Sequence, residues 1–126
     1  MMDAGAFAEA GEYFIDYWVR SGTWKRMTED RKKAFTAGMC AASPEWHASF
    51  HDKTPLSAFA AMDVPTLLLS GGGSTVPART ITALLSSVIP HGKMENLEGI
   101  GHMGPVTHPE IVNSRIEAFL IGIPTA

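Results

Sequence analysis

A short apolar run, Thr66–Ser70, constrains the fold more than any other stretch of this sequence. Pro65 precedes the run and the glycines of Gly71–Gly73 follow it. A continuous apolar run between such residues is typical of a β-strand that is buried on both faces, as the strands of parallel sheets are. The sequence therefore predicts one strand of a helix-covered sheet at this position.

The segment after this strand predicts how the sheet continues. An amphipathic helix follows the glycines and stops at Pro90-His91-Gly92, and a second strand is expected at Lys93–Leu97. Two strands separated by a helix form a βαβ unit, so we expect them to be parallel with a right-handed crossover. A final helix begins at Pro109. Each of the two helices is expected to bury one apolar stripe. The stripe of the first helix contains Ile81, Leu84, Leu85 and Val88, and that of the final helix contains Ile111, Val112, Ile116, Phe119 and Leu120.

The first 54 residues predict helices only. Large aromatic side chains fall on one helical stripe, which has to pack against something. Thr28 is a plausible N-cap of a second helix, and Ser43-Pro44 starts a third in the favoured order of cap and proline. We therefore divide the chain into a helical segment, 1–54, and a βαβα segment, 55–126, of the α/β class. The aromatic stripe contains Phe7, Phe14, Tyr17 and Trp18.

A glycine-punctuated turn follows the second strand and contains a histidine. Gly99 and Gly101 precede His102, and Gly104 follows two residues later. Glycines allow a sharp turn, because they adopt positive φ and let the backbone pass close to other atoms. We expect the imidazole of His102 to project from this turn.

Two stretches together resemble the last third of an α/β-hydrolase. Asp63–Gly72 contains Val-Pro-Thr-Leu-Leu-Leu-Ser-Gly, and Asn96–Met103 ends in Gly-His-Met. The resemblance implies that the first stretch is the penultimate strand of that family's sheet and that His102 is its catalytic histidine. Residues 1–54 resemble the end of the family's lid. The expected fold is a partial α/β-hydrolase fold, with a helical lid-like segment before a parallel βαβα unit.

The resemblance also implies a function. In a serine hydrolase the histidine is the general acid/base of a Ser-His-acid site that hydrolyses small-molecule esters or related acyl compounds. The nucleophile elbow, Gly-x-Ser-x-Gly, does not occur in the 126 residues. We therefore expect the C-terminal portion of such an enzyme, inactive alone, with nucleophile and oxyanion donors supplied by an N-terminal half. The alternative is a non-catalytic, self-associating domain derived from a hydrolase.

The sequence departs from the family at the position of the catalytic acid. In many members of the family the carboxylate lies three residues after the glycine that ends the penultimate strand, and here that position is Ser74. Either the acid comes from elsewhere in the sheet or the histidine is unsupported. Ser70, Ser74 and Thr75 are expected to cap the loop. If the family geometry survives, the loop of Gly71–Val76 and the turn of Gly99–Met103 lie side by side at the strand ends.

Other site chemistries fit the residues less well. His47 and His51 lie four apart beside Asp52, a spacing that metals use, but Ala48 stands where a zinc hydrolase has its glutamate. Solvated surface histidines are the better interpretation, and no metal is expected. A non-family enzyme that uses His47, His51 and His102 is a distant third hypothesis.

A phosphate or nucleotide-binding βαβ module is a remote alternative. The glycines of Gly71–Gly73 lie between a strand and a helix N-terminus, where phosphates bind in other proteins. The Walker A ending is absent, and the dinucleotide spacing needs a glycine or alanine where Val76 stands. No cofactor is therefore expected.

Composition limits the partners. The net charge of −3 and the lack of a long basic run argue against nucleic acid and against an anionic membrane surface as partners. The cytoplasm is taken as the default location. A two-stranded sheet is seldom stable by itself, so we expect homo-oligomers, most simply a two-fold dimer. The dimer would extend the sheet or cover it with the aromatic stripe of Phe7, Phe14 and Trp18.

Overall fold

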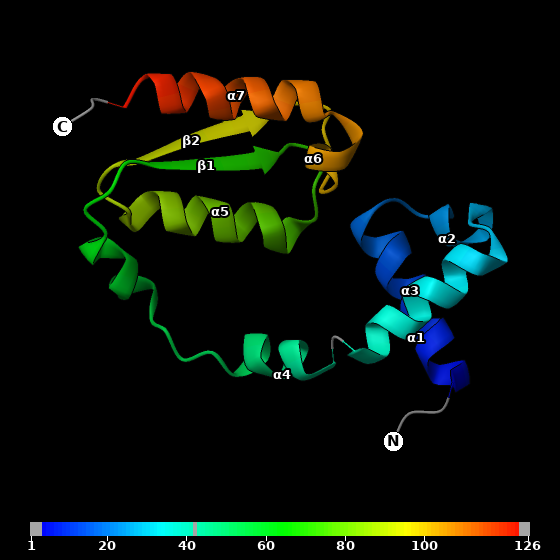
Figure 1. Cartoon of the computed structure of the whole chain (residues 1–126). Helices are drawn as coiled ribbons and strands as arrows, with labels where there is room; N and C mark the ends of the chain where they lie inside the picture. The colour runs from blue at the N-terminus through cyan, green and yellow to red at the C-terminus, as the bar shows by residue number, and fades with distance from the viewer. Residues whose placement is uncertain (1–3, 42, 124–126) are drawn as a thin grey trace. The chain divides into compact units, whose positions relative to one another are not determined.

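The structure is a computed structural model that describes residues 4–41 and 43–123. Its contacts divide the chain into two compact units, Met1–Lys53 and Thr54–Ala126 (Figure 1). Each unit has its own architecture and is described separately. In the part of the chain covered by this description, no helix combines the length and the apolar character needed to cross a membrane.

The first unit is helical, as the sequence predicted. It contains α1 (Ala4–Trp18), α2 (Thr23–Arg26), α3 (Glu29–Ala41) and α4 (Ser43–His51). Most of the predicted aromatic stripe packs inside this unit, but Tyr17 is 44% exposed. The ring of Phe14 lies 5.8 Å from that of Phe35 on α3 and 5.3 Å from that of Trp46 on α4. Trp24 on α2 is 7% exposed, so α1, α2 and α3 share one small apolar core.

A carboxylate orders the tight connection between α1 and α2. The backbone N–H of Gly22 donates to one oxygen of Asp16 at 2.7 Å, and that of Trp24 donates to the other at 2.9 Å. Gly22 has a φ of 76°, a conformation that favours glycine. The hydrogen bonds from Trp24 and then from Gly22 hold the pKa of Asp16 below its ordinary value of 3.8, because they stabilise the ionised form.

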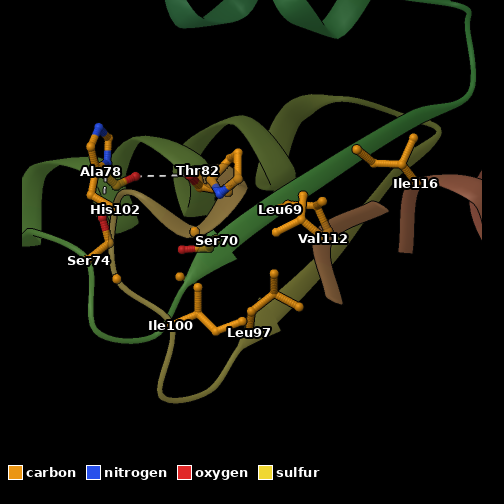
Figure 2. Close-up of a pocket in the computed structure, with 14 residues that line it drawn as sticks. Leu69, Ser70, Ser74, Ala78, Thr82, Leu97, Ile100, His102, Val112 and Ile116 are labelled. Carbon is orange, nitrogen blue, oxygen red and sulfur yellow. Dashed lines mark hydrogen bonds between the residues drawn. The ribbon is translucent and has the colours of Figure 1, made fainter. Parts of the chain in front are cut away.

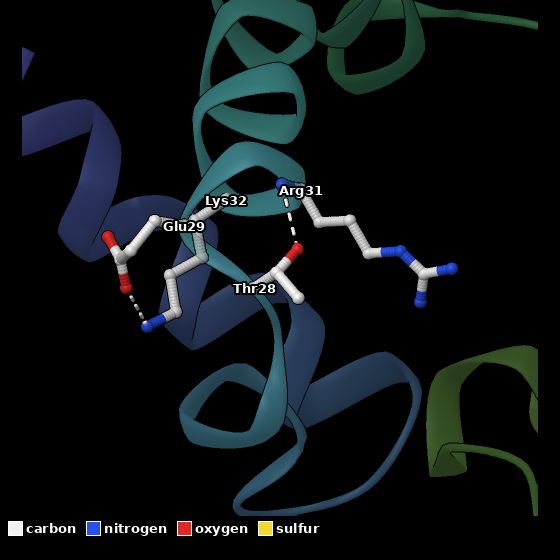
Figure 3. A network of polar contacts seen from close by, with 4 residues as sticks. All are labelled: Thr28, Glu29, Arg31 and Lys32. Carbon is white, nitrogen blue, oxygen red and sulfur yellow. Dashed lines mark hydrogen bonds and ion pairs between the residues drawn. The ribbon is translucent and has the colours of Figure 1, made fainter.

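Helix α3 begins with a side-chain cap (Figure 3). The hydroxyl of Thr28 accepts a hydrogen bond from the backbone N–H of Arg31 at 3.4 Å. One turn into the helix, Lys32 pairs with Glu29 at 2.8 Å. The N-cap predicted at Thr28 is therefore confirmed, and the acidic first turn suits the helix dipole.

The second unit contains the sheet. A short 3₁₀ helix, η1 (Leu56–Ala61), precedes β1 (Thr66–Gly71) and α5 (Val76–Val88). The elements after them are β2 (Gly92–Leu97), α6 (Gly104–Thr107) and α7 (Pro109–Ile121). Strands β1 and β2 are parallel, with Thr66 opposite Gly92 and Gly71 opposite Leu97. Helix α5 lies on one face of the sheet and α7 on the other (Figure 1). The predicted parallel βαβα unit is confirmed.

The predicted burial of the helix stripes is only partly correct. Val112 on α7 is buried, but Ile81 and Leu84 on α5 are 57% and 47% exposed. Leu120 on α7 is 59% exposed, and Ile111 and Ile116 are also exposed. The reason is geometric. Neighbouring strands are about 4.8 Å apart, whereas a helix with its side chains is about 10–12 Å wide, so a two-stranded sheet covers only part of each helix.

Candidate active site

His102 projects from a tight turn that follows β2. Gly99 has a φ of 73°, which reverses the chain immediately after the strand. Ile100, 5% exposed, anchors the turn in the core. A Cβ at Gly104 would lie 2.6 Å from the side chain of Ile100, so glycine is required for this close packing. The imidazole of His102 is left on the surface, as predicted.

The loop after β1 lies against this turn. The backbone N–H of Gly72 donates to the carbonyl of Leu97 at 2.9 Å, and that of Gly73 donates to the carbonyl of Ile100 at 3.0 Å. A Cβ at Gly71 would lie 2.6 Å from the carbonyl oxygen of Ile100 and 2.8 Å from that of Gly101. The predicted contact between Gly71–Val76 and Gly99–Met103 is therefore confirmed, and it depends on glycine at position 71.

These two segments bring Ser74 and His102 together (Figure 2). The Ser74 hydroxyl lies 3.2 Å from Nδ1 of His102, within hydrogen-bonding distance. The backbone N–H of Ser74 donates to the carbonyl of Gly71 at 2.9 Å, which fixes the position of the serine relative to the strand. The side chain of Ser74 thus contacts the histidine, as its place at the family's acid position implied, although loop capping was the role predicted for the hydroxyl itself.

A hydroxyl at this position orients the histidine without placing a negative charge beside the imidazole. It donates to Nδ1 of one tautomer or accepts from Nδ1–H of the other. A carboxylate in the same place would accept from Nδ1–H and stabilise the imidazolium as well. The contact with Ser74 therefore supplies the orienting part of an acid–histidine pair, and Ser74 itself carries no charge.

The neighbouring hydroxyls do not have the predicted capping role. Thr75 is the N-cap residue of α5, but its side chain makes no capping hydrogen bond. The Oγ1 atom of Thr75 is buried and has no hydrogen-bond partner within the described residues. Ser70 is 5% exposed and faces the same region from the end of β1.

A cavity of about 330 Å³ adjoins the histidine. Polar groups stand at one end of it, where Ser74 and His102 meet, and apolar side chains from the sheet and both helices form most of its wall (Figure 2). Most ligand pockets combine an apolar wall with a few placed polar groups in this way. The apolar wall includes Leu69, Leu97, Ile100, Val112 and Ile116.

The glycine loop is poorly suited to a phosphate. Phosphate-binding loops direct several backbone N–H groups at the anion. Here the N–H groups of Gly72, Gly73 and Ser74 all donate to carbonyls of the chain itself. This arrangement argues against the nucleotide-binding alternative.

The paired histidines of the first unit form a surface feature. The rings of His47 and His51 are stacked with centroids 4.0 Å apart, and both residues are exposed, as predicted. Nδ1 of His51 lies 2.8 Å from the carbonyl of His47. Across the residues that the structure describes, no cluster of three or more His, Cys, Asp or Glu could hold a metal ion.

Comparisons with known proteins identify the fold. No protein-family model and no curated protein matches the sequence. A serine hydrolase involved in carbazole degradation, the CarC enzyme, superposes with a TM-score of 0.63 at 16% identity, over 90% of this chain and 47% of its own. A bromoperoxidase from Bacillus anthracis superposes with a TM-score of 0.65 at 19% identity, over 94% of this chain and 44% of its own.

Both structures are enzymes of the α/β-hydrolase fold. The chain therefore has part of that fold, as the sequence predicted, and it spans less than half the length of either structure.

Proposed function

We propose that this chain contributes the general acid/base of a serine-hydrolase site that cleaves esters or related acyl compounds. The contact of 3.2 Å between Ser74 and Nδ1 of His102 is the observation that carries the proposal. It places a hydrogen-bonding side chain beside the histidine at the position, three residues after Gly71, where the family that the sequence resembles has its acid. The nucleophile would come from polypeptide outside these 126 residues.

In the proposed mechanism the two ring nitrogens of His102 have separate tasks. Nδ1 is oriented by Ser74, and Nε2 takes the proton of the attacking serine hydroxyl as the serine oxygen bonds to the acyl carbon. The same proton then passes from Nε2 to the leaving alcohol as its bond to the acyl carbon breaks. Water repeats the sequence to release the acid and restore the serine. Small ester-like molecules are the proposed substrates, and the cytoplasm is the proposed location.

The uncharged partner sets the expected strength of this base. Because Ser74 cannot stabilise the imidazolium as a carboxylate would, His102 is expected to be a weaker general base than that of a complete triad. We therefore expect low activity if Ser74 is the main partner of Nδ1, and higher activity if a carboxylate also reaches the imidazole.

The test requires the longer polypeptide. The reading frame upstream of Met1 is sequenced for Gly-x-Ser-x-Gly, and the joined chain is assayed with a short-chain nitrophenyl ester. We expect an elbow in that frame and an activity that His102→Ala removes, while His91→Ala, at an exposed histidine that pairs with Asp63, leaves it unchanged. Absence of the elbow, or full activity in His102→Ala, would contradict the proposal.

A non-catalytic, self-associating domain is the second candidate. The uncharged Ser74 beside the histidine supports it, and so do the apolar helix faces that the small sheet leaves exposed. In this case the histidine turn is retained for packing. The longer chain, or this one, would then show no ester hydrolysis that depends on His102, and association would be its main property.

A further inference from the structure

Helix α4 carries a pair of histidines outside the site already described. His47 and His51 lie four residues apart, about one helical turn, so their side chains share one face of the helix. Their rings are stacked, with centroids 4.0 Å apart and an interplanar angle of 26°. Both residues are exposed. The proposed hydrolase chemistry does not use this pair.

A backbone carbonyl determines which nitrogen of one ring carries a proton. Nδ1 of His51 lies 2.8 Å from the carbonyl oxygen of His47. Because a carbonyl oxygen only accepts, Nδ1 must carry the proton and donate the hydrogen bond. In the neutral ring the lone pair is therefore on Nε2, which is directed away from the helix backbone. Histidines that bind metals are commonly held in this way, with the other ring N–H donating to a carbonyl or a carboxylate.

The ring of His47 is available as a second ligand. Among residues 4–41 and 43–123 its nitrogens have neither a hydrogen bond nor an ion pair. Two nitrogens on one metal ion lie about 3 Å apart, given metal–nitrogen bonds of about 2.0–2.1 Å. Since no hydrogen bond holds the ring of His47, a rotation of its side chain can bring a nitrogen to this distance from Nε2 of His51.

The charges of α4 suit a cation. The helix, Ser43–His51, contains Glu45 and no lysine or arginine. The two histidines span its last turn, where the backbone carbonyls give a helix a partial negative charge. A positive ion bound there is stabilised by the helix dipole. An ion that both histidines ligate would also join successive turns of a helix of only 9 residues.

We propose that Nε2 of His51 and a ring nitrogen of His47 bind one divalent transition-metal ion, with water in its remaining positions. Imidazole suits copper, nickel and zinc, whereas Mg²⁺ and Ca²⁺ take oxygen ligands. Cu²⁺ is expected to bind most tightly, following the general order of affinities for such ligands. Across the described residues no third His, Cys, Asp or Glu completes a larger group, so these residues supply two ligands. The site is therefore open and exchangeable, unlike a structural zinc site with four protein ligands.

The missing glutamate does not count against ion binding. Ala48 stands where a zinc hydrolase has its glutamate, and the sequence therefore favoured solvated surface histidines. In those enzymes the glutamate is the general base that activates water, and the two histidines are the ligands. Its absence argues against catalysis at His47 and His51 and leaves binding of an ion open. The inference goes beyond the proposed hydrolase function and does not depend on it.

Paramagnetic broadening in the whole chain shows which histidines bind. The chain has 5 histidines, so His91, His102 and His108 are internal controls. With substoichiometric Cu²⁺ at neutral pH, we expect the ring-proton resonances of His47 and His51 to broaden first and together. The broadening should disappear in acid, because ligating histidines must be neutral. An excess of Mg²⁺ should not displace the copper.

A variant with an unchanged number of histidines tests the spacing. His47→Ala combined with Ser49→His keeps two histidines in α4 but places them two residues apart, on different sides of the helix. We expect the affinity for Cu²⁺ to fall about tenfold or more in this variant and in His51→Ala, because each loses the two-ligand site. His91→Ala is the control and should bind Cu²⁺ as the parent does. Isothermal titration calorimetry measures the affinities, and far-UV circular dichroism checks that each variant is folded.

Two results would overturn the proposal. The first is broadening that begins at another histidine or affects all of them equally, which would indicate binding by separate imidazoles. The second is an equal affinity for Cu²⁺ in the parent and in the variant with the altered spacing. If the variants fail to fold, the broadening in the parent chain decides alone. None of these readouts uses catalytic activity, so they are independent of the hydrolase proposal.

Discussion

The Ser74 hydroxyl and Nδ1 of His102 lie 3.2 Å apart although the two residues are 28 positions apart in the sequence. Backbone contacts produce this approach: Gly72 and Gly73 donate to carbonyls of the segment that leads to the histidine. Since these contacts do not involve the side chain at position 74, the geometry does not require serine there. An acidic residue would occupy the same place relative to the imidazole.

Gly71 is expected to be essential for this contact. In Gly71→Ala the new Cβ would meet the carbonyl oxygens of Ile100 and Gly101 at 2.6 and 2.8 Å. Both are backbone atoms, so relief requires the turn to move, at a cost of about 1–3 kcal/mol of unfolding free energy in the second unit. Gly101→Ala is the matched control, because a Cβ there meets nothing within 4 Å.

Urea unfolding followed by far-UV circular dichroism measures the effect of Gly71→Ala. Tryptophan fluorescence is unsuitable, because Trp18, Trp24 and Trp46 all belong to the first unit. Equal stabilities of Gly71→Ala and the parent would show that the close approach of loop and turn does not exist in solution.

The isolated chain is expected to lack serine-hydrolase turnover. No Gly-x-Ser-x-Gly elbow is present in its 126 residues. A histidine without its nucleophile can act only as a weak general base for attack by water. A fluorophosphonate probe and a short-chain nitrophenyl ester measure labelling and turnover, with heat-unfolded chain as the control. Stoichiometric labelling that His102→Ala abolishes would refute this expectation, because it would reveal a serine nucleophile within the chain.

Asp16 is expected to make the first unit sensitive to acid. Its folded-state pKa is lowered by the hydrogen bonds from Trp24 and Gly22, so the ionised form is the one that the fold stabilises. The contribution is present above the ordinary value of 3.8 and is lost as the pH falls below it. Tryptophan fluorescence during acid titration should show the first unit losing stability in that range.

Asp16→Asn should remove most of this acid dependence and destabilise the first unit at neutral pH. Asp30→Asn is the control, because Asp30 is an exposed acid in the first turn of α3. If Asp16→Asn and the parent lose stability in parallel as the pH falls, the two backbone hydrogen bonds contribute nothing to the stability of this unit.

Much of the second unit could be predicted because local sequence determines it. The apolar run of β1, the glycines and the proline at position 109 predicted a parallel βαβα unit without any knowledge of its neighbours. The proximity of loop and turn followed from a general property, since parallel strands place their carboxyl ends at one edge of the sheet. Position 74 was expected near the histidine from the family's pattern, and only the direct contact of the Ser74 hydroxyl with Nδ1 of His102 required the structure.

The parts that were missed depend on what surrounds each element. The stripes of α5 and α7 were predicted as core, but the exposure of Ile81 and Leu84 depends on the width of the sheet, which a helix pattern does not contain. The contacts of Asp16 were missed because they join its carboxylate to backbone groups six and eight residues away. An acid at the end of a helix, followed by a glycine turn, was the available signal.

Titration of the His102 ring protons by NMR in Ser74→Asp tests most directly whether the geometry of an acid–histidine pair exists here. The new carboxylate would lie beside Nδ1, and a nearby opposite charge favours the protonated imidazole, so we expect the pKa of His102 to rise relative to the parent. Ser74→Asn, with a side chain of similar size and no charge, should not raise it. Identical titration curves of His102 in the parent and in Ser74→Asp would contradict the account, because the side chain at position 74 would then not approach the histidine.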